Sequence, residues 1–490
     1  MKTMDRRSFL NTSALASASI GLLPMLGCKS TNPTVHTRVR GANEDIRVAV
    51  VGFNGRGRSH ISGFRALKGV RVVALCDVDQ NVLDKGVKEF QDRGETVTGY
   101  QDIRQLLENS EIDVVSLATP NHWHALGAIW AVQAGKDVYV EKPVSHNIFE
   151  GRQTVAAARK YIRMVQTGSQ CRSSVGLQEA IAWLQAGNHG KIIRARGLCY
   201  KRRASIGKAE QPLVIPASID YDLWCGPAPK EVPLMRKKLH YDWHWVWPSG
   251  NGDLGNQGVH QMDIARWVLG ENELAPTSFS IGGRLGYEDD GTTPNTHIVL
   301  HNYKKAPLLF EVRGLPASST TDKMGNYHGA SIGVVVDCEG GRVVIPSYDT
   351  AIVFDKAGKE IKKFSEGGDH FANFIKAVRS RKHTDLNADI QDGHLSAALC
   401  HTANISYRLG KQRSPDAIRD AVRNNPEMAE MLGRMEEHLA ANQVDLKKAP
   451  ATLGEVLNMD ITKETFLGNP AASRLRTRDY RKPFVVSEKV

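Results

Sequence analysis

A lysine and a histidine stand out as residues that could move a proton at neutral pH. Lys142 follows the apolar run "DVYVE" and precedes Pro143, and His260 opens the helical pattern "HQMDIARWVLG". When a carbinol carbon is oxidised by hydride transfer, its hydroxyl proton must leave as well, and a histidine suits that task. A buried lysine can orient the hydroxyl and stabilise developing negative charge. We interpret Lys142 and His260 as a candidate catalytic pair; a helix-start hydrogen-bonding role is the alternative for His260.

The position of His260 in the predicted helix also bears on its charge. A histidine in the first turn of a helix lies near the positive end of the helix dipole, which favours the neutral imidazole. The neutral ring is the form that accepts a proton. The sequence therefore predicts that His260 is uncharged at neutral pH.

A glycine-rich turn near the start of the chain predicts a dinucleotide site. The buried strand pattern "IRVAVVG" leads into a turn that resembles G-x-G-x-x-G, with Asn54 at the middle glycine position, and a helical pattern follows. The next strand ends at Asp77, whose carboxylate would accept the adenosine ribose hydroxyls and repel a 2′-phosphate. This favours NAD over NADP, although Arg56 could help to bind a phosphate. The predicted cofactor contacts in this region are Gly52, Phe53, Asn54, Gly55, Arg56 and Asp77.

Two further strand patterns end in polar motifs. "DVVSLAT" leads into "TPNHWH", and "DVYVE" leads into "EKP". Ligands in open α/β sheets bind at the carboxyl edge of the strands, so both motifs should face the same ligand. His122 and His124 could suggest a metal pair, but no third ligand follows at a suitable spacing, so we expect no metal site.

At these motifs the sequence resembles the Gfo/Idh/MocA oxidoreductase family, and the similarity continues through "LWCGPAP", "HYDWHW" and "GNGDLGNQGVHQMDIARW". The resemblance implies an α/β Rossmann domain followed by an α+β domain with a large open, mainly antiparallel sheet. It also implies a homo-oligomer, a dimer or a tetramer. By position, it makes Lys142 the catalytic lysine and His260 the base. It places Thr119, Pro120, Asn121, His124, Glu141 and Lys142 against the cofactor.

One position departs from the family pattern. The family often has an aspartate four residues before the histidine, whereas this chain has Asn256. An amide cannot take up a proton, so a proton-relay role at this position is in doubt.

Aromatic and basic residues in the second half indicate a sugar-binding surface. "YDWHWVWPSGNGD" gathers Tyr241 and three tryptophans around His244, and aromatic faces beside polar groups suit sugar rings. A core strand with alternating aromatic residues is the alternative. The basic run "YKRR" adds Lys201, with a solvated loop as its alternative. The predicted substrate contacts are Lys142, Lys201, Tyr241, His244, Asn256 and His260.

The amino-terminal segment resembles a twin-arginine export signal. Arg6 and Arg7 precede "SFL", and the apolar stretch from Ala14 to Leu26 is too short to span a bilayer. "MLGC" resembles a lipobox with Cys28 as the lipidated residue, and simple cleavage nearby is the alternative. We expect a periplasmic protein that contacts the membrane only through a lipid at Cys28.

Charge and pattern define the remaining expectations. Residues 1–40 hold six basic residues against Asp5, so they carry +5 of the net charge of +11, and no basic run predicts nucleic-acid binding.

The predicted organisation is a signal (1–28), a linker (29–45), a Rossmann domain (46–168), a substrate and oligomerisation domain (169–450) and a C-terminal tail packing on the domains (451–490).

Three functional hypotheses follow. The first is an NAD(P)-dependent oxidoreductase that moves hydride between a sugar or glycoside hydroxyl and a tightly bound cofactor. The second is an NAD-dependent glycosidase that works by transient oxidation, elimination, hydration and re-reduction. Exported glycosidases related to the family usually lack the lysine of "EKP", so Lys142 favours the first hypothesis. The third is a non-catalytic sugar-binding lipoprotein, against which the intact Gly52, Asp77, Lys142 and His260 argue.

Overall fold

The computed structural model describes residues 45–490. The predicted signal, with Arg6, Arg7 and Cys28, and nearly all of the predicted linker lie outside these residues. Within 45–490, no helix combines the length and the hydropathy needed to cross a bilayer.

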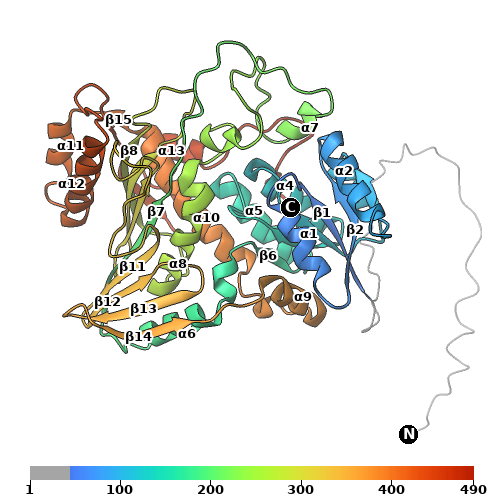
Figure 1. Cartoon of the computed structure of the whole chain (residues 1–490), viewed down its shortest axis with the longest axis horizontal. Helices are drawn as coiled ribbons and strands as arrows, with labels where there is room; N and C mark the ends of the chain where they lie inside the picture. The colour runs from blue at the N-terminus through green and yellow to red at the C-terminus, as the bar shows by residue number, and fades with distance from the viewer. Residues whose placement is uncertain (1–44) are drawn as a thin grey trace, which may run out of the picture. The chain divides into compact units, whose positions relative to one another are not determined.

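The first domain is a parallel sheet with helices on both faces, as the sequence predicts (Figure 1). Its strands lie in the order β3-β2-β1-β4-β5-β6, which is the doubly wound arrangement, and β1, β4, β5 and β6 are fully buried. The strands are β1 (Ile46–Val51), β2 (Val70–Cys76), β3 (Thr98–Tyr100), β4 (Val114–Leu117), β5 (Asp137–Val140) and β6 (Val165–Thr167). The helices are α1 (Gly57–Arg65), α2 (Gln80–Gln91), α3 (Ile103–Glu108), α4 (His124–Gln133) and α5 (Ile148–Lys160).

The second domain is built on a 12-stranded sheet in which β7 and β10 pair in parallel and the other pairs are antiparallel, which confirms the predicted fold class. Its longer strands are β7 (Ile192–Tyr200), β8 (Thr277–Gly283), β9 (Thr296–Asn302), β10 (Leu308–Arg313), β11 (Ile332–Cys338), β12 (Gly341–Ile345), β13 (Thr350–Asp355) and β14 (Glu360–Ser365). Short strands complete it: β15 (Lys411–Gln412), β16 (Thr452–Leu453), β17 (Leu457–Asp460) and β18 (Thr465–Phe466).

Alternate residues of these strands enter two different cores. Phe310 on β10 packs with α6 (Val175–Gln185), α8 (Val259–Leu269) and α10 (Ile390–Leu409). Its neighbour Leu309 packs on the opposite face with α11 (Pro415–Val422) and α12 (Pro426–Ala441). This alternation is the period of two that a strand imposes. Both faces of this part of the sheet are therefore covered by helices of the same chain.

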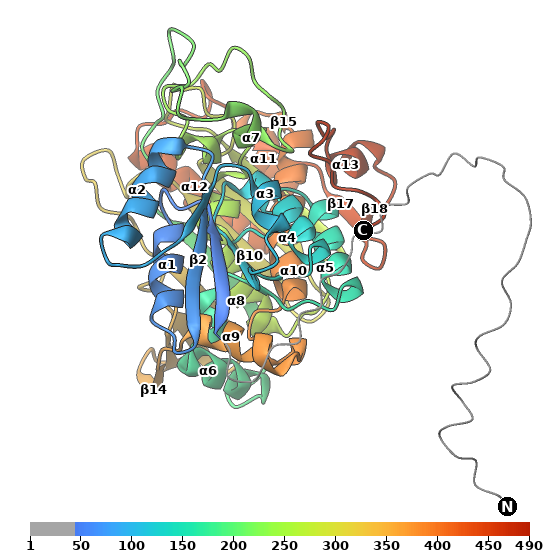
Figure 2. The same ribbon diagram turned by 90° about the vertical axis from the view of Figure 1, so that its right-hand side faces the viewer.

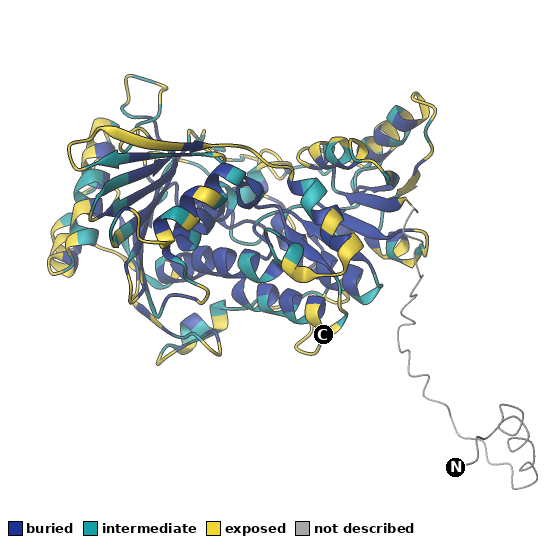
Figure 3. Cartoon of the chain, turned by 90° about the horizontal axis from the view of Figure 1, so that it is seen from below, coloured by how far each residue is buried: buried dark blue, intermediate teal, exposed yellow. Residues whose placement is uncertain are grey.

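Two helices connect the domains. Helices α8 and α10 lie between the two sheets, and α9 (His370–Ser380) packs on the first domain (Figure 1). In α10, 15 of the 20 residues are buried, because α5 covers one side and β8 the other. Figure 3 shows this buried interior between exposed outer surfaces.

A long connection after β7 returns to the first domain before the chain reaches α8 (Figure 2). Its short helix α7 (Tyr221–Cys225) is held at the end of β2, where the Gln80 N–H donates to the Ser218 carbonyl and the Asp220 N–H donates to the Val78 carbonyl. Residues Asp242–Trp245 form a 3₁₀ helix, so the alternative of a core strand is wrong. The connection thus lies over the carboxyl edge of the parallel sheet.

Candidate active site

A single cavity of about 830 Å³ runs between the two domains. One end is lined by the glycine turn and Asp77, and the other by the connection after β7 and the start of α8. Of the sequence-predicted site residues, all except Phe53 line this cavity. They are Gly52, Asn54, Gly55, Arg56, Asp77, Thr119, Pro120, Asn121, His124, Glu141, Lys142, Lys201, Tyr241, His244, Asn256 and His260.

The glycine turn requires glycine at its first position. Gly52 has a φ of +76°, and a Cβ there would lie 2.8 Å from the Thr119 backbone nitrogen. No other residue allows this close approach of β1 to the loop after β4. Phe53 contributes its backbone only, because its side chain is fully buried beneath the turn against Gly86.

Asp77 is placed to bind a ribose. Its carboxylate accepts hydrogen bonds from the backbone N–H groups of Phe53 and Asp79, each at 3.1 Å, which fixes its orientation at the cavity wall. Burial raises the pKa of Asp77, while the two N–H donors oppose this change. Each oxygen keeps a lone pair for a ribose hydroxyl. The position fits the NAD arrangement expected from the sequence.

The loop after β4 offers unsatisfied polar atoms to a ligand. Thr119 Oγ1 and Asn121 Oδ1 are buried and have no partner among the described residues. Asn121 Nδ2 donates to Asn251 Oδ1 at 2.6 Å, which joins this loop to the second domain. Buried polar groups are normally satisfied, so both atoms fit the hydroxyls of a nicotinamide ribose.

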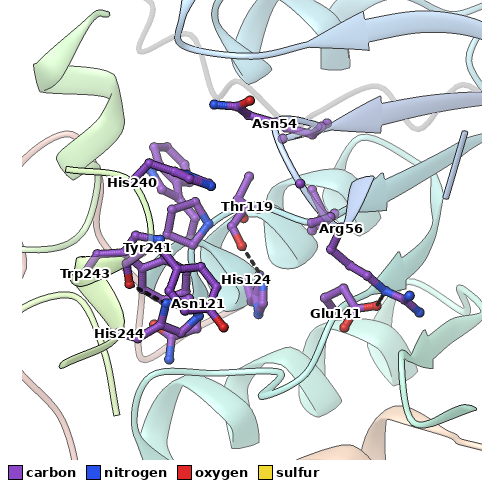
Figure 4. A pocket seen from close by; sticks show the side chains of 18 of the residues that line it. Asn54, Arg56, Thr119, Asn121, His124, Glu141, His240, Tyr241, Trp243 and His244 are labelled. Carbon is purple, nitrogen blue, oxygen red and sulfur yellow. Dashed lines mark hydrogen bonds and ion pairs between the residues drawn. The ribbon is translucent and has the colours of Figure 1, made fainter. Parts of the chain in front are cut away.

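His124 braces this loop rather than presenting a free nitrogen. Its ring lies between the carbonyls of Pro143 (2.7 Å) and Thr119 (2.8 Å), and Figure 4 shows the contact with Thr119. Burial lowers the pKa of His124, so the neutral ring donates to one of the two. His122 is likewise held by backbone carbonyls, those of Trp224 and Ser249. Residues 45–490 contain no group of His, Cys, Asp or Glu side chains arranged to hold a metal ion.

Glu141 is the centre of a buried ionic network. It accepts from Arg56 Nε at 2.9 Å and contacts His60 Nε2 at 3.0 Å, and Figure 4 shows Arg56 directed at it. Burial opposes its ionisation, but His60 and the neighbouring cations hold the pKa of Glu141 well below its usual range. The Nε of Arg56 is therefore engaged with Glu141, while Asp77 is placed at the cavity wall for a ribose.

Lys142 points across the cavity to the second domain. Its Nζ donates to the Asn256 carbonyl at 2.9 Å. Asn256 lies in a π-helical turn, Leu254–Gly258, directly before α8, and such turns are frequent at functional sites. Burial lowers the pKa of Lys142, while the charge of Glu141 opposes this. The side-chain Nδ2 of Asn256 is buried without a partner in the described structure.

His260 is neutral, but not for the reason that the sequence suggests. The helical stretch begins before the π-helical turn, so His260 does not lie at the free end of a helix. Burial instead lowers its pKa to about 3. Its ring lies 4.9 Å from that of Tyr348, and its Nδ1 has no partner among residues 45–490. The unprotonated ring is available as a proton acceptor at the cavity.

The connection after β7 supplies an aromatic wall. His244 stacks on Trp243 with 3.5 Å between ring centroids, and its Nδ1 donates to the Tyr241 carbonyl at 2.7 Å (Figure 4). Tyr241 has a φ of +72°, a costly conformation for a residue other than glycine. Burial lowers the pKa of His244 to about 3, so its Nε2 is a lone-pair acceptor.

Sequence reasoning missed Gln170, Gln257 and Tyr348, which also line the cavity. Gln257 Nε2 donates to the Tyr348 hydroxyl at 2.7 Å, and its Oε1 accepts from Lys201 Nζ at 2.9 Å. Gln257 lies one turn before His260, and that spacing could have drawn attention to it. Tyr348 comes from the turn between β12 and β13, and no local sequence signal indicates that this turn reaches the site.

Two family models match the chain. Residues 46–169 match the model described as "Oxidoreductase family, NAD-binding Rossmann fold", and residues 188–306 match "Oxidoreductase family, C-terminal alpha/beta domain". The chain belongs to the Gfo/Idh/MocA oxidoreductase family. The first domain is the NAD-binding fold of this family, and the glycine turn and Asp77 fit that cofactor.

Curated relatives match part of the chain. A glycosyl hydrolase family 109 protein of Shewanella pealeana is 31% identical over 170 residues, 32% of this chain and 37% of that protein. A protein of the same description from Saccharopolyspora erythraea is 27% identical over 206 residues, 39% of this chain and 45% of that protein. The chain thus aligns with less than half the length of these relatives.

Solved structures match more of the chain at lower identity. The WlbA dehydrogenase of Bordetella pertussis, crystallised with NADH and UDP-GlcNAcA, has a TM-score of 0.55 at 18% identity and covers 74% of this chain and 97% of its own. GenD2 of gentamicin A biosynthesis, crystallised with NAD, has a TM-score of 0.52 at 17% identity, with 78% and 96% covered. These likenesses show the two-domain fold of the Gfo/Idh/MocA family.

An arginine near the C-terminus connects segments of the two domains beside the candidate active site. Arg478 Nη2 lies 2.8 Å from Glu150 Oε1; the Glu150 side chain is buried and that of Arg478 is only 12% exposed. The same guanidinium donates to the carbonyls of His122 and Pro248, each at 3.3 Å. Arg478 therefore joins helix α5, the loop after β4 and the segment before Asn251.

We expect Arg478→Met to accelerate NAD release by at least about tenfold, because a broken buried pair leaves Glu150 uncompensated and frees the loop beside the nicotinamide. The check is the rate at which NAD leaves the loaded protein, followed with an excess of competing cofactor. Lys482→Met, an exposed change in the same segment, is the control. An unchanged release rate in Arg478→Met would show that Arg478 does not hold the loop beside the nicotinamide in place.

Buried neutral histidines predict that stability falls in acid. Burial lowers the pKa values of His122, His260, His297, His301 and His401 to about 3. Between pH 6.5 and 3 the unfolded chain binds protons that the folded chain does not. The free energy of unfolding should therefore decrease as pH falls through this range, by up to about 1.4 kcal/mol per pH unit for each histidine.

Denaturant titrations between pH 7 and 4.5 measure this slope. In His297→Phe, unfolding should take up about one proton fewer, so the free energy of unfolding should depend less steeply on pH. The exposed His383→Gln serves as a control. A free energy of unfolding that is constant across this range would contradict the assignment of these histidines as neutral in the fold.

Proposed function

We propose that the protein is an NAD-dependent oxidoreductase that transfers hydride between a hydroxyl of a sugar or glycoside and a tightly bound nicotinamide cofactor. The observation that carries this proposal is one continuous cavity that joins Gly52 and Asp77 at one end to Lys142 and His260 at the other. The first pair suits a dinucleotide, and the second suits oxidation of an alcohol.

The side chains of this site divide the work of alcohol oxidation. NAD, when bound, supplies the hydride acceptor. Lys142, oriented by the Asn256 carbonyl, donates a hydrogen bond to the substrate hydroxyl and stabilises negative charge on its oxygen. His260, kept neutral by burial, accepts the hydroxyl proton. Glu141, tied to Arg56 and His60, maintains a negative charge beside Lys142 and opposes its deprotonation.

A sugar substrate is supported by the aromatic wall. Trp243, Tyr241 and His244 line the substrate end of the cavity, and flat rings beside polar groups suit the faces and edges of a sugar. The nucleotide sugar in the WlbA dehydrogenase crystal and the glycosyl hydrolase relatives agree with this substrate class.

Reduction of the bound cofactor tests the proposal. The NAD-loaded protein is mixed with a panel of glycosides and free sugars, and absorbance at the wavelength of reduced nicotinamide is followed. We expect a rise in absorbance with at least one sugar, and a rise that is slower by about 100-fold in His260→Gln. If no sugar changes the absorbance of the loaded protein, the oxidoreductase proposal is wrong.

A second candidate is a glycosidase that oxidises the sugar transiently. The glycosyl hydrolase family 109 relatives favour it, and so does the second neutral histidine, because elimination and hydration need a further proton acceptor. His244 would supply that group opposite Lys142. We prefer the dehydrogenase because Lys142 is present, and the products of the reaction distinguish the two.

We also propose that the protein is exported through the twin-arginine route and anchored by a lipid at Cys28, from the sequence pattern of residues 1–28. Replacing Arg6 and Arg7 with lysine should retain the protein in the cytoplasm, as judged by cell fractionation. Cys28→Ala should leave export intact and release the protein from membranes. Unaltered fractionation of the double lysine variant would contradict the export route.

A further inference from the structure

The substrate end of the cavity has an unusual balance of charges. Lys142 Nζ and Lys201 Nζ both line it, and each donates to a neutral oxygen, that of the Asn256 carbonyl and that of the Gln257 side-chain amide. Among residues 45–490, neither ammonium has a carboxylate within 4 Å. Two ammonium groups therefore face the same space without a direct ion pair, and the nearest negative charge acting on Lys142 is that of Glu141.

The carboxylates nearest to this end are already paired. Asp253 accepts from Arg203 through both oxygens, at 2.8 and 2.6 Å, and its side chain is only 2% exposed. Glu141 is paired with Arg56 and His60. The other acidic residues that line the cavity, Asp77, Asp79 and Asp102, lie at the opposite, cofactor end.

This arrangement is poorly matched to a neutral sugar. Adjacent hydroxyls are donors as well as acceptors, and a site for them needs acceptor groups such as free carboxylates. Here the charged groups are donors, two ammoniums beside the partnerless Nδ2 of Asn256, whereas the acceptors, the ring nitrogens of His244 and His260, are neutral. Two ammonium groups without a direct ion pair favour an anionic ligand.

Lys201 is the group best placed to bind that anion. It directly follows β7, where its backbone N–H donates to the Arg313 carbonyl at 3.0 Å, so the base of its side chain is fixed. Its ammonium contacts Gln257, which contacts Tyr348, whose ring lies against His260. Lys201 is thus linked to the proposed base through two side chains, Gln257 and Tyr348, and all of them line the same cavity as Lys142.

We propose that the substrate is an acidic sugar, carrying a carboxylate or a sulfate ester beside the carbon that is oxidised, and that Lys201 binds this anionic group. The proposal rests on the proposed sugar oxidoreductase function. It predicts that the negative charge of the substrate relieves the repulsion between Lys142 and Lys201, so that acidic sugars bind tightly where neutral ones bind weakly.

Matched substrates test the proposal. The NAD-loaded full chain is given methyl glycosides of gluco, galacto and manno configuration, each as the neutral sugar, the uronic acid and the 6-sulfate. We expect kcat/KM to be at least about tenfold higher for an anionic member than for its neutral partner, chiefly through KM. The uronic acid and sulfate arms distinguish the two sources of the anion.

Variants assign the effect to one side chain. Lys201→Met should bring the ratio of anionic to neutral kcat/KM close to one, chiefly by raising KM for the anionic sugar. Lys208→Met removes an exposed lysine of the same segment and should keep the ratio of the parent protein. Calorimetric binding of the same sugars gives a second readout that does not depend on turnover.

The outcomes separate this proposal from the proposed function. Equal kcat/KM and equal binding for anionic and neutral sugars would overturn the anionic subsite while leaving sugar oxidation intact. A preference that persists in Lys201→Met would overturn the assignment to Lys201. Binding of the anionic sugar that depends on Lys201, without reduction of the cofactor, would support the subsite and reject the oxidoreductase function. Absence of binding by every sugar would overturn both.

Discussion

Lys142→Met should lower turnover by about 10³-fold while NAD stays bound, because methionine keeps the length of the side chain but loses its charge and its donors. The ammonium is held by the Asn256 carbonyl at 2.9 Å and faces the cavity that His260 also lines. Removing it takes away the group that orients the hydroxyl and stabilises charge on its oxygen. Single-turnover reduction of the cofactor measures the chemical step directly.

Two comparisons give this result its meaning. Lys376→Met removes an exposed lysine of α9 and should have the turnover of the parent protein. NAD bound per chain, measured after gel filtration, should be equal in all three proteins. Turnover within threefold of the parent in Lys142→Met would show that Lys142 has no catalytic role.

Gly52→Ala should weaken NAD binding by at least about 100-fold, because the added Cβ is both strained and obstructed. The backbone φ of +76° disfavours any side chain, and the Cβ would lie 2.8 Å from the Thr119 nitrogen. The turn and the loop after β4 would have to separate, and both line the cofactor end of the cavity. Equilibrium titration of the protein with NAD, after removal of any bound cofactor, gives the dissociation constant.

Two other glycines distinguish backbone strain from steric obstruction as the cause of weaker binding. Gly94 has a φ of +75° but open space around an added Cβ, so Gly94→Ala tests the backbone strain alone and should bind NAD normally. Gly55 lines the cavity and has no atom within 4 Å of an added Cβ, so Gly55→Ala should fold normally yet bind NAD more weakly. Parent-like affinity in Gly52→Ala would show that this turn does not form the cofactor site.

The first domain was largely predictable because most of its strands are uninterrupted buried runs. "IRVAVV" and "DVYV" became β1 and β5, and turns with glycine or Pro143 follow them at the carboxyl edge. Parallel strands bring their carboxyl ends together, so residues that follow different strands meet without any long-range information. Asp77, Thr119 and Lys142 are placed by this rule alone.

Long-range packing decided what could not be predicted. Tyr348 reaches His260 from a distant turn, and Arg478 reaches Glu150 from near the C-terminus. Neither contact leaves a periodic or motif-like signal. The neutrality of His260 was predicted from a helix dipole, but the π-helical turn at Leu254–Gly258 extends the helix past it, and burial is the cause.

Product analysis by mass spectrometry tests the central claim most directly. The NAD-loaded protein is incubated with a panel of neutral and acidic glycosides, and the masses of the products are compared with those of the starting compounds. Our account predicts a product that has lost two hydrogens and keeps its glycosidic bond, formed in proportion to reduced cofactor. Free sugar and free aglycone without net oxidation would contradict the dehydrogenase and establish the glycosidase.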